Sequence, residues 1–122
     1  MKKILTPLEL QVMNLMWQKE KVFVKDLIAH WPKDTEAKKP AYNTISTIVR
    51  ILESKDFVGH KAYGRTHEYY PKITKEDYQK FFIQNAIEKV FAGSVSSLVS
   101  ALVDDEKVSK DDLDDLKKML DE

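Results

Sequence analysis

The sequence contains no cysteine, which excludes a disulfide, a thiolate metal site and a thiol redox switch. It has only three glycines in 122 residues, so a glycine-rich phosphate-binding loop is hard to build. No apolar run approaches the roughly 20 residues that a membrane-spanning helix needs. The N-terminus is basic but runs directly into a helix that carries Glu9, so we expect no secretory signal and a cytoplasmic location.

What is present is a core-forming composition, with 43% hydrophobic residues, and an uneven distribution of charge. Residues 1–73 hold 13 lysines and arginines against 8 acidic residues, a net charge of +5. Residues 74–122 hold 7 against 12, a net charge of −5. A basic half and an acidic half indicate that only the first approaches a polyanion. We therefore predict two domains, 1–73 and 74–122.

Residues 38–71 are the stretch around which the chain is organised, beginning with a helix. Pro40 suits the first helical position, where a missing N–H costs nothing. An apolar stripe follows at helical spacing, formed by Ile45, Ile48, Val49 and Leu52. Acidic residues are absent from the opposite face until Glu53. A face of short hydroxyl and amide groups with one arginine favours contact with base edges and phosphates over a plainly solvated surface.

Two short segments rich in aromatic and β-branched residues come next, 57–61 and 66–70, and they predict a β-hairpin. Residues 62–65 form the turn, in which Gly64 can take a positive φ. Lys61 and Arg65 place positive charge at the tip. A recognition-type helix followed by a cationic hairpin is the winged form of helix-turn-helix, in which the hairpin straddles the neighbouring DNA backbone.

The preceding residues supply the two other helices that this fold requires. Thr6 and Glu9 can form a capping box with Pro7 at the first helical position, which predicts a helix ending at Trp17. A second helix is expected over about Val24–Trp31, because Pro32 forbids its continuation. The predicted fold is mainly α with a small β-hairpin, a winged helix-turn-helix followed by a helical dimerisation region.

The second half carries helices predicted over 78–91 and 95–103, and a last helix that starts at Ser109 and Asp112 and carries Leu113, Leu116 and Leu120. Its 49 residues hold more apolar surface than so short a segment can bury alone, so we expect a symmetric homodimer. The alternative is that these helices fold back on the winged helix. The expected interface consists of Phe82, Ile83, Ile87, Val90, Phe91, Val95, Leu98, Val99 and Leu102.

These patterns lead to a double-stranded DNA partner, with no cofactor and no metal. The expected DNA-binding residues are Tyr42, Asn43, Thr44, Ser46, Thr47, Arg50, Lys61 and Arg65. Among them, Asn43 and Thr47 are expected to contact bases, and Arg50 a guanine or a phosphate. Lys61 and Arg65 are expected to hold the backbone on the side of the hairpin.

Other hypotheses are weaker. A turn at Tyr63-Gly64 would set His60 opposite His67, but two ligands without a carboxylate are a poor metal site. No nucleophile lies beside a base, and the acidic cluster from Asp111 to Asp115 reads as a solvated helix face, so an enzyme is not expected. A winged helix used only for protein contact would expose apolar residues on its third helix, which Thr47 and Arg50 argue against.

The chain resembles the bacterial penicillinase-repressor family over nearly its whole length. The matching segments are Leu5-Thr6, Glu9, Val12-Met13 and Trp17, then 44–48, Leu52, 55–58, 69–71, Gly93-Ser94 and 97–99. The resemblance implies a dimeric winged-helix repressor on a two-fold operator, released when a partner protease, a membrane sensor, cuts its dimerisation region.

Two departures from the family pattern limit what the resemblance implies. Copper-responsive members carry Cys-x-Cys motifs, so copper sensing is not expected here. Antibiotic-responsive members are cut at an Asn-Phe pair, and the matching positions in this chain are Ala101-Leu102.

Overall fold

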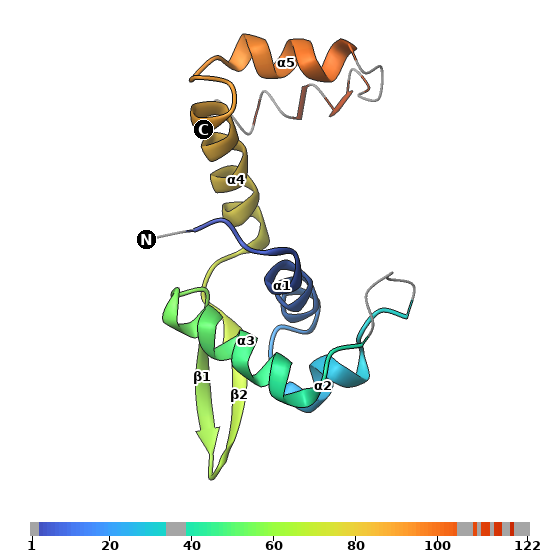
Figure 1. Ribbon diagram of the computed structural model, residues 1–122, viewed down its shortest axis with the longest axis vertical. Helices are drawn as coiled ribbons and strands as arrows, with labels where there is room; N and C mark the ends of the chain where they lie inside the picture. The colour runs from blue at the N-terminus through green and yellow to red at the C-terminus, as the bar shows by residue number, and fades with distance from the viewer. Residues whose placement is uncertain are drawn as a thin grey trace. The chain divides into compact units, whose positions relative to one another are not determined.

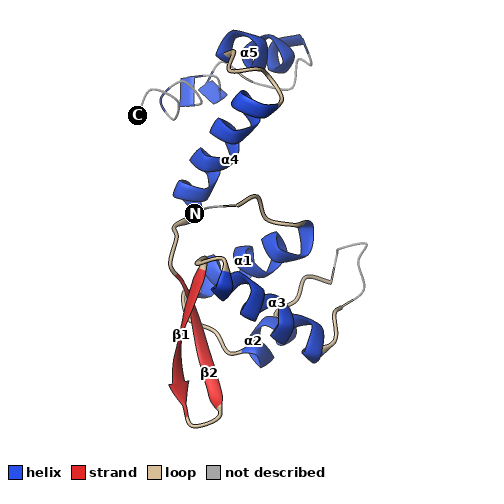
Figure 2. Ribbon diagram, turned by 60° about the vertical axis from the view of Figure 1, so that its left-hand side comes forward, coloured by secondary structure: helices blue, strands red, loops and turns tan. Residues whose placement is uncertain are grey.

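The computed structural model describes residues 3–33, 39–104, 109, 111–112, 114–115 and 118. The chain divides into two compact units, Met1–Lys75 and Glu76–Glu122. In the described residues the fold is mainly helical with a two-stranded antiparallel hairpin, which confirms the predicted fold class (Figures 1 and 2).

The first unit has the element order of a winged helix-turn-helix. Its elements are α1 (Pro7–Lys19), α2 (Val24–Ala29), α3 (Tyr42–Ser54), β1 (Val58–Tyr63) and β2 (Thr66–Pro71). Figure 2 shows the hairpin, in red, extending away from the three helices of this unit. Apolar residues from all of these elements fill one core, in which the residues that are almost fully buried include Val12, Met13, Met16, Leu27, Ile45, Val49, Leu52, Phe57 and Val58.

The start of α1 follows the predicted capping box. The N–H of Glu9 donates to Oγ1 of Thr6 at 3.3 Å, and the N–H of Thr6 donates to Oε1 of Glu9 at 2.8 Å. The predicted end at Trp17 was wrong, because α1 continues to Lys19. Glu20, whose φ of 68° lies in the left-handed region, then ends the helix, and its N–H still donates to the carbonyl of Met16.

The second helix is shorter than predicted, ending at Ala29 instead of Trp31. A proline disfavours the helical conformation of the residue before it, so Pro32 restricts Trp31 as well as itself. His30 caps the end, with its N–H donating to the carbonyl of Asp26. Trp31 nevertheless lies in the core, as its place on the apolar side of this segment suggested.

The third helix begins at Tyr42, so the prediction that Pro40 occupies the first helical position was wrong. Ala41 is the N-cap in an extended conformation, and its carbonyl accepts the first helical hydrogen bond, from the N–H of Ile45 at 3.2 Å. Ile45, Val49 and Leu52 of the predicted stripe are buried, and Ile48 is half-buried.

The hairpin turn lies at Gly64-Arg65, one residue later than the Tyr63-Gly64 turn considered from the sequence. Tyr63 therefore pairs with Thr66, and His60 pairs with Tyr69 instead of His67. Gly64 has a φ of 65°, which the two-residue turn requires and which glycine adopts without strain.

A single residue between α1 and α2 adds a third strand position beside the middle of the hairpin. Val22 pairs with Tyr69 in an antiparallel bridge. The N–H of Val22 donates to the carbonyl of Tyr69 at 2.9 Å, and the N–H of Tyr69 donates to the carbonyl of Val22 at 2.7 Å. Val22 thus forms one pair of a sheet immediately before α2 begins.

The second unit contains α4 (Lys75–Lys89) and α5 (Val95–Asp104). The capping pattern of Thr74 and Asp77 is compatible with the observed start of α4 at Lys75, whereas its end at Lys89 comes before the predicted Phe91. Ala92 and Gly93 both have a positive φ, 50° and 80°, and the N–H of Gly93 donates to the carbonyl of Ile87 at 2.8 Å. This closing turn ends α4, and Ser94 then starts α5 by accepting from the N–H of Ser97 at 3.1 Å.

The start of the predicted last helix is present, since Ser109 and Asp112 exchange side chain to backbone hydrogen bonds. Leu113, Leu116 and Leu120 lie outside the described residues.

Candidate nucleic-acid interface

The polar face of α3 is the centre of the candidate site. Burial of Ile45, Val49 and Leu52 turns the opposite side of the helix outward. Of the six predicted contact residues on this helix, Tyr42, Asn43, Thr44, Thr47 and Arg50 are exposed and Ser46 is half-buried. Tyr42 is 56% exposed, a large fraction for an aromatic side chain at the start of a helix.

Two hydrogen bonds along α3 orient polar groups of this face. Oγ1 of Thr47 donates to the carbonyl of Asn43 at 2.9 Å, and Nη2 of Arg50 donates to Oγ of Ser46 at 3.1 Å. A guanidinium has five N–H donors in a planar fork, so Arg50 keeps donors for a guanine or a phosphate while its side chain lies along the helix.

The hairpin presents the predicted cations on the same unit. Lys61 and Arg65 are both exposed, and the ammonium of Lys61 lies 5.4 Å from the centre of the Tyr63 ring. At the base of the hairpin, a Cβ added to Gly59 would lie only 2.7 Å from the hydroxyl of Tyr70, which packs across the strand. The glycine lets this ring cover the pair of strands.

An open hollow of about 540 Å³ separates the hairpin from α3. It brings together residues of the start of α2, of α3 and of the hairpin, namely Phe23, Val24, Lys25, Tyr42, Asn43, Ser46, Arg50, Arg65, Thr66, His67 and Tyr69. Every charged residue in this lining is cationic: Lys25, Arg50 and Arg65. Such a hollow attracts an anionic chain, because nothing in its lining offsets the positive charge.

The sequence did not single out Phe23 or Lys25 as parts of the site. Their neighbours in the hollow are distant in the chain, and the only local signal is an exposed lysine beside an aromatic residue at the start of a short helix. Of the predicted DNA-binding residues, the hollow joins Tyr42, Asn43, Ser46, Arg50 and Arg65, while Thr44, Thr47 and Lys61 lie outside its lining.

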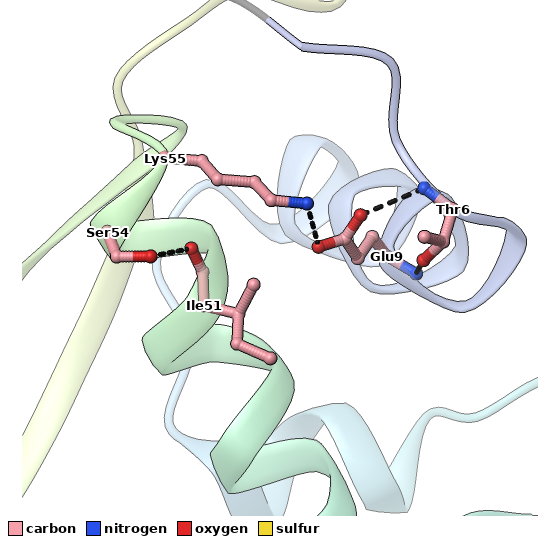
Figure 3. Close-up of polar contacts among 5 residues, drawn as sticks. All are labelled: Thr6, Glu9, Ile51, Ser54 and Lys55. Carbon is pink, nitrogen blue, oxygen red and sulfur yellow. Dashed lines mark hydrogen bonds and ion pairs between the residues drawn. The ribbon is translucent and has the colours of Figure 1, made fainter.

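A partly buried ion pair fixes one end of α3 against α1. Lys55, the C-cap of α3, pairs with the Glu9 carboxylate (Figure 3). Its Nζ lies 2.8 Å from Oε2 of Glu9. Glu9 is only 2% exposed, and its other carboxylate oxygen accepts from the N–H of Thr6. Burial alone would raise the pKa of Glu9, but the hydrogen bonds from Lys55 and Thr6 and the lysine charge together hold it below its ordinary value.

A cluster of rings lies on the hairpin, where His60 meets α3. The imidazoles of His60 and His67 stack with centres 4.1 Å apart, although the two residues are not paired across the strands. Nδ1 of His60 is hydrogen-bonded to the carboxylate of Glu53. Burial, with the nearby charge of Glu53, raises the pKa of Tyr69. Among the described residues, no group of three or more histidines and carboxylates is placed to hold a metal ion.

The second unit carries the residues expected at a dimer interface. Ile87 and Leu98 are buried within it, but Val90 is 74% exposed and Phe82 is 46% exposed. Val95 is also exposed, and Ile83, Phe91, Val99 and Leu102 are half-buried. A single chain thus leaves much of this apolar surface open to water. Ala101, the first residue of the expected cleavage pair, is exposed on α5.

Comparison with known proteins shows to which family this chain belongs. The sequence profile of the penicillinase repressor family matches residues 5–122. The chain belongs to that family. The methicillin resistance regulatory protein MecI of Staphylococcus aureus (strain N315) is 30% identical over 114 residues, which cover 92% of this chain and 89% of MecI. The penicillinase repressor of Bacillus licheniformis is 27% identical over 124 residues, covering 100% of this chain and 94% of the relative.

Among solved structures, the solution structure of the DNA-binding domain of the repressor BlaI superposes with a TM-score of 0.52 at 30% identity. It covers 64% of this chain and 94% of the BlaI domain. Penicillinase repressors are transcriptional regulators rather than enzymes, in agreement with the sequence-based reading. The described part of this family member has no helix both long and apolar enough to cross a membrane.

Proposed function

We propose that this penicillinase-repressor family member is a homodimeric repressor that reads an inverted-repeat operator in double-stranded DNA. The observation that carries the proposal is the hollow between α3 and the hairpin, whose charged lining residues are all cationic. It lies beside a helix face with exposed amide and hydroxyl groups. A DNA strand presents one phosphate per 3.4 Å, and base edges lie next to it in the major groove.

In this proposal α3 enters the major groove. Asn43 and Thr47 contact base edges, and Arg50 contacts a guanine or a phosphate. Tyr42, Thr44 and Ser46 line the same face. Lys61 and Arg65 hold the backbone beside the hairpin, which positions the helix without reading sequence.

Dimerisation through residues 74–122 is the second part of the proposal. The exposed side chains of Phe82, Val90 and Val95 support it, because a second copy would remove this apolar surface from water. The interface would include the half-buried Ile83, Phe91, Val99 and Leu102 and extend from the buried Ile87 and Leu98. A two-fold dimer presents two winged helices to half-sites about one helical turn, or a multiple of it, apart.

Release by proteolysis near Ala101-Leu102 is the third part. Both residues lie within α5, so a cut there would divide a helix of the dimerisation region and leave the DNA-binding unit intact. The partner would be a sensor protease, acting on a cytoplasmic repressor. Relatives named for methicillin resistance and penicillinase suggest antibiotic-resistance genes as targets.

Footprinting tests the core of the proposal. The full chain is titrated onto its own upstream region, since such repressors commonly control their own transcription units. We expect protection of two symmetric half-sites on one face of the duplex. Protection without two-fold symmetry would contradict the dimeric mode, and absence of DNA binding would favour the alternative, a winged helix used only for protein contact.

A further inference from the structure

Two adjacent residues, Val22 and Phe23, hold the hairpin at two separate points. Val22 pairs with Tyr69, which lies midway along the hairpin opposite His60. The ring of Phe23 lies 6.2 Å from the ring of Tyr63, centre to centre, with the two planes inclined by 57°. This spacing falls in the attractive range for aromatic pairs. Tyr63 is the last residue of β1, directly before the turn, so the second point of attachment is at the tip.

A lysine ammonium group lies over each of these two rings. Nζ of Lys25 lies 5.8 Å from the centre of the Phe23 ring, and Nζ of Lys61 lies 5.4 Å from the centre of the Tyr63 ring. Both distances are within reach of a cation–π interaction. The result is a row of lysine, phenylalanine, tyrosine and lysine that runs from α2 to the hairpin. We call this row the aromatic bridge.

The aromatic bridge borders the cationic hollow. Phe23 and Lys25 line the hollow together with Arg50 and Arg65. Lys25 is exposed on the α2 side, whereas Arg65 reaches the hollow from the turn of the hairpin. Cations on opposite sides of a hollow can hold one phosphate backbone only if the two sides stay at a fixed separation.

We propose that Phe23 and Tyr63 are positioning residues that fix the hairpin tip relative to α2, and that Lys25 is a further phosphate contact. The inference rests on the proposed DNA binding and adds residues to it. A hairpin held only at Tyr69 would have to be ordered at its tip on binding, and that ordering reduces affinity. The aromatic bridge orders the tip in the free protein, so this loss of entropy does not occur on DNA binding. It also holds the Lys25 and Lys61 ammonium groups over the rings.

The contact by Lys25 is tested by the salt dependence of operator binding. In the full chain, Lys25→Ala should lower the slope of log K against log salt by about one unit. Lys19→Ala is the matched control, since Lys19 is exposed on α1 and outside the lining of the hollow. If the wild-type chain showed no salt-dependent duplex binding, the proposed function itself would fail. A wild type that binds, with Lys25→Ala behaving as Lys19→Ala does, would overturn only the phosphate contact.

The positioning role of Phe23 and Tyr63 is tested by combining substitutions at the two positions and comparing their effects on operator affinity. Tyr63→Leu removes a ring that is 51% exposed, so folding should be retained. We expect it to raise the operator Kd by up to about tenfold, the scale of one aromatic pair, while Tyr63→Phe leaves Kd unchanged. Phe23→Leu should then cost less in the Tyr63→Leu background than in the wild type, because the contact between the two rings is already lost.

A purely structural role would not change what Arg65 contributes to binding. We expect Arg65→Ala to cost less affinity in the Tyr63→Leu chain than in the wild type, because the tip cation is no longer held in place. The salt slope of the Tyr63→Leu chain should fall as well. Equal losses from Arg65→Ala in both backgrounds, with an unchanged slope, would overturn the positioning role. The Tyr63 variants decide this even if Phe23→Leu fails to fold.

Discussion

Nζ of Lys55 lies 2.8 Å from Oε2 of Glu9, so the first turn of α1 is fastened to the C-terminal end of the recognition helix. The carboxylate is almost completely buried, and its second oxygen is bonded to the N–H of Thr6. The pair thus fixes the C-terminal end of α3 against the first turn of α1.

Removing the lysine should destabilise the first unit. Lys55→Met leaves the Glu9 carboxylate buried without its cation, which should lower the free energy of unfolding by about 3 kcal/mol in urea titrations. Lys72→Met is the matched control, because its partner Asp56 is exposed, and we expect no measurable change. Equal losses in the two variants would show that Glu9 is not effectively buried.

The same pair predicts a loss of stability in acid. The pKa of Glu9 is lowered in the folded protein, so the unfolded chain takes up this proton first as the pH falls. The stabilising contribution is complete above the unfolded pKa of about 4.3 and is lost as the pH falls through the lower native value. Glu9→Gln should therefore be less stable than wild type at neutral pH, with a difference that shrinks in acid. A difference independent of pH would contradict the prediction.

Variants of the hairpin should lose affinity for every duplex, whereas variants of α3 should lose affinity mainly for the operator. Lys61→Ala and Arg65→Ala should weaken binding to every duplex and lower the salt slope by about one unit each. Asn43→Ala and Thr47→Ala should lose about 1–3 kcal/mol mainly on the operator. Competition gel shifts with operator and random duplexes measure both effects. If all four variants lost the same affinity on operator and random duplexes, α3 would not be the element that recognises the operator sequence.

A charge on the exposed face of α4 should separate the dimer. Phe82→Glu places a carboxylate where the second copy is expected to pack, so the chain should sediment as a monomer. Loss of the intramolecular second contact should lower operator affinity by about 100-fold. Gln84→Glu adds the same charge at another exposed position of α4 and should leave both measurements near wild type. A dimeric Phe82→Glu chain would move the interface elsewhere.

Cutting α5 should release the operator without touching a DNA contact. A foreign protease site is placed at residues 100–102, and the uncut variant serves as control. Cleavage should convert dimers to monomers and reduce affinity for the full operator, while affinity for a single half-site stays the same. Cleaved protein that stays dimeric and keeps its operator affinity would refute this mode of release.

Local patterns in the sequence predicted the element order, the α1 capping box and the outward face of α3, because these features depend on neighbours a few residues apart. The hairpin turn was one residue off, since both positions of the turn are compatible with Gly64 at a positive φ. The Glu9–Lys55 pair and the Phe23–Tyr63 contact could not be predicted. Each joins residues far apart in the chain, and each depends on how packed elements meet.

The turn between α4 and α5 has a kinetic consequence. Its backbone is set by Ala92 and Gly93 and by the hydrogen bond from Gly93 to Ile87, all within one chain. The direction in which α5 leaves α4 is therefore defined before any partner is present (Figure 1). Two copies would meet as preformed surfaces, without folding on contact, so association should proceed at the rate of ordinary protein docking, about 10⁵–10⁷ M⁻¹s⁻¹. The lifetime of the pair, rather than its rate of formation, would then decide how long an operator stays occupied.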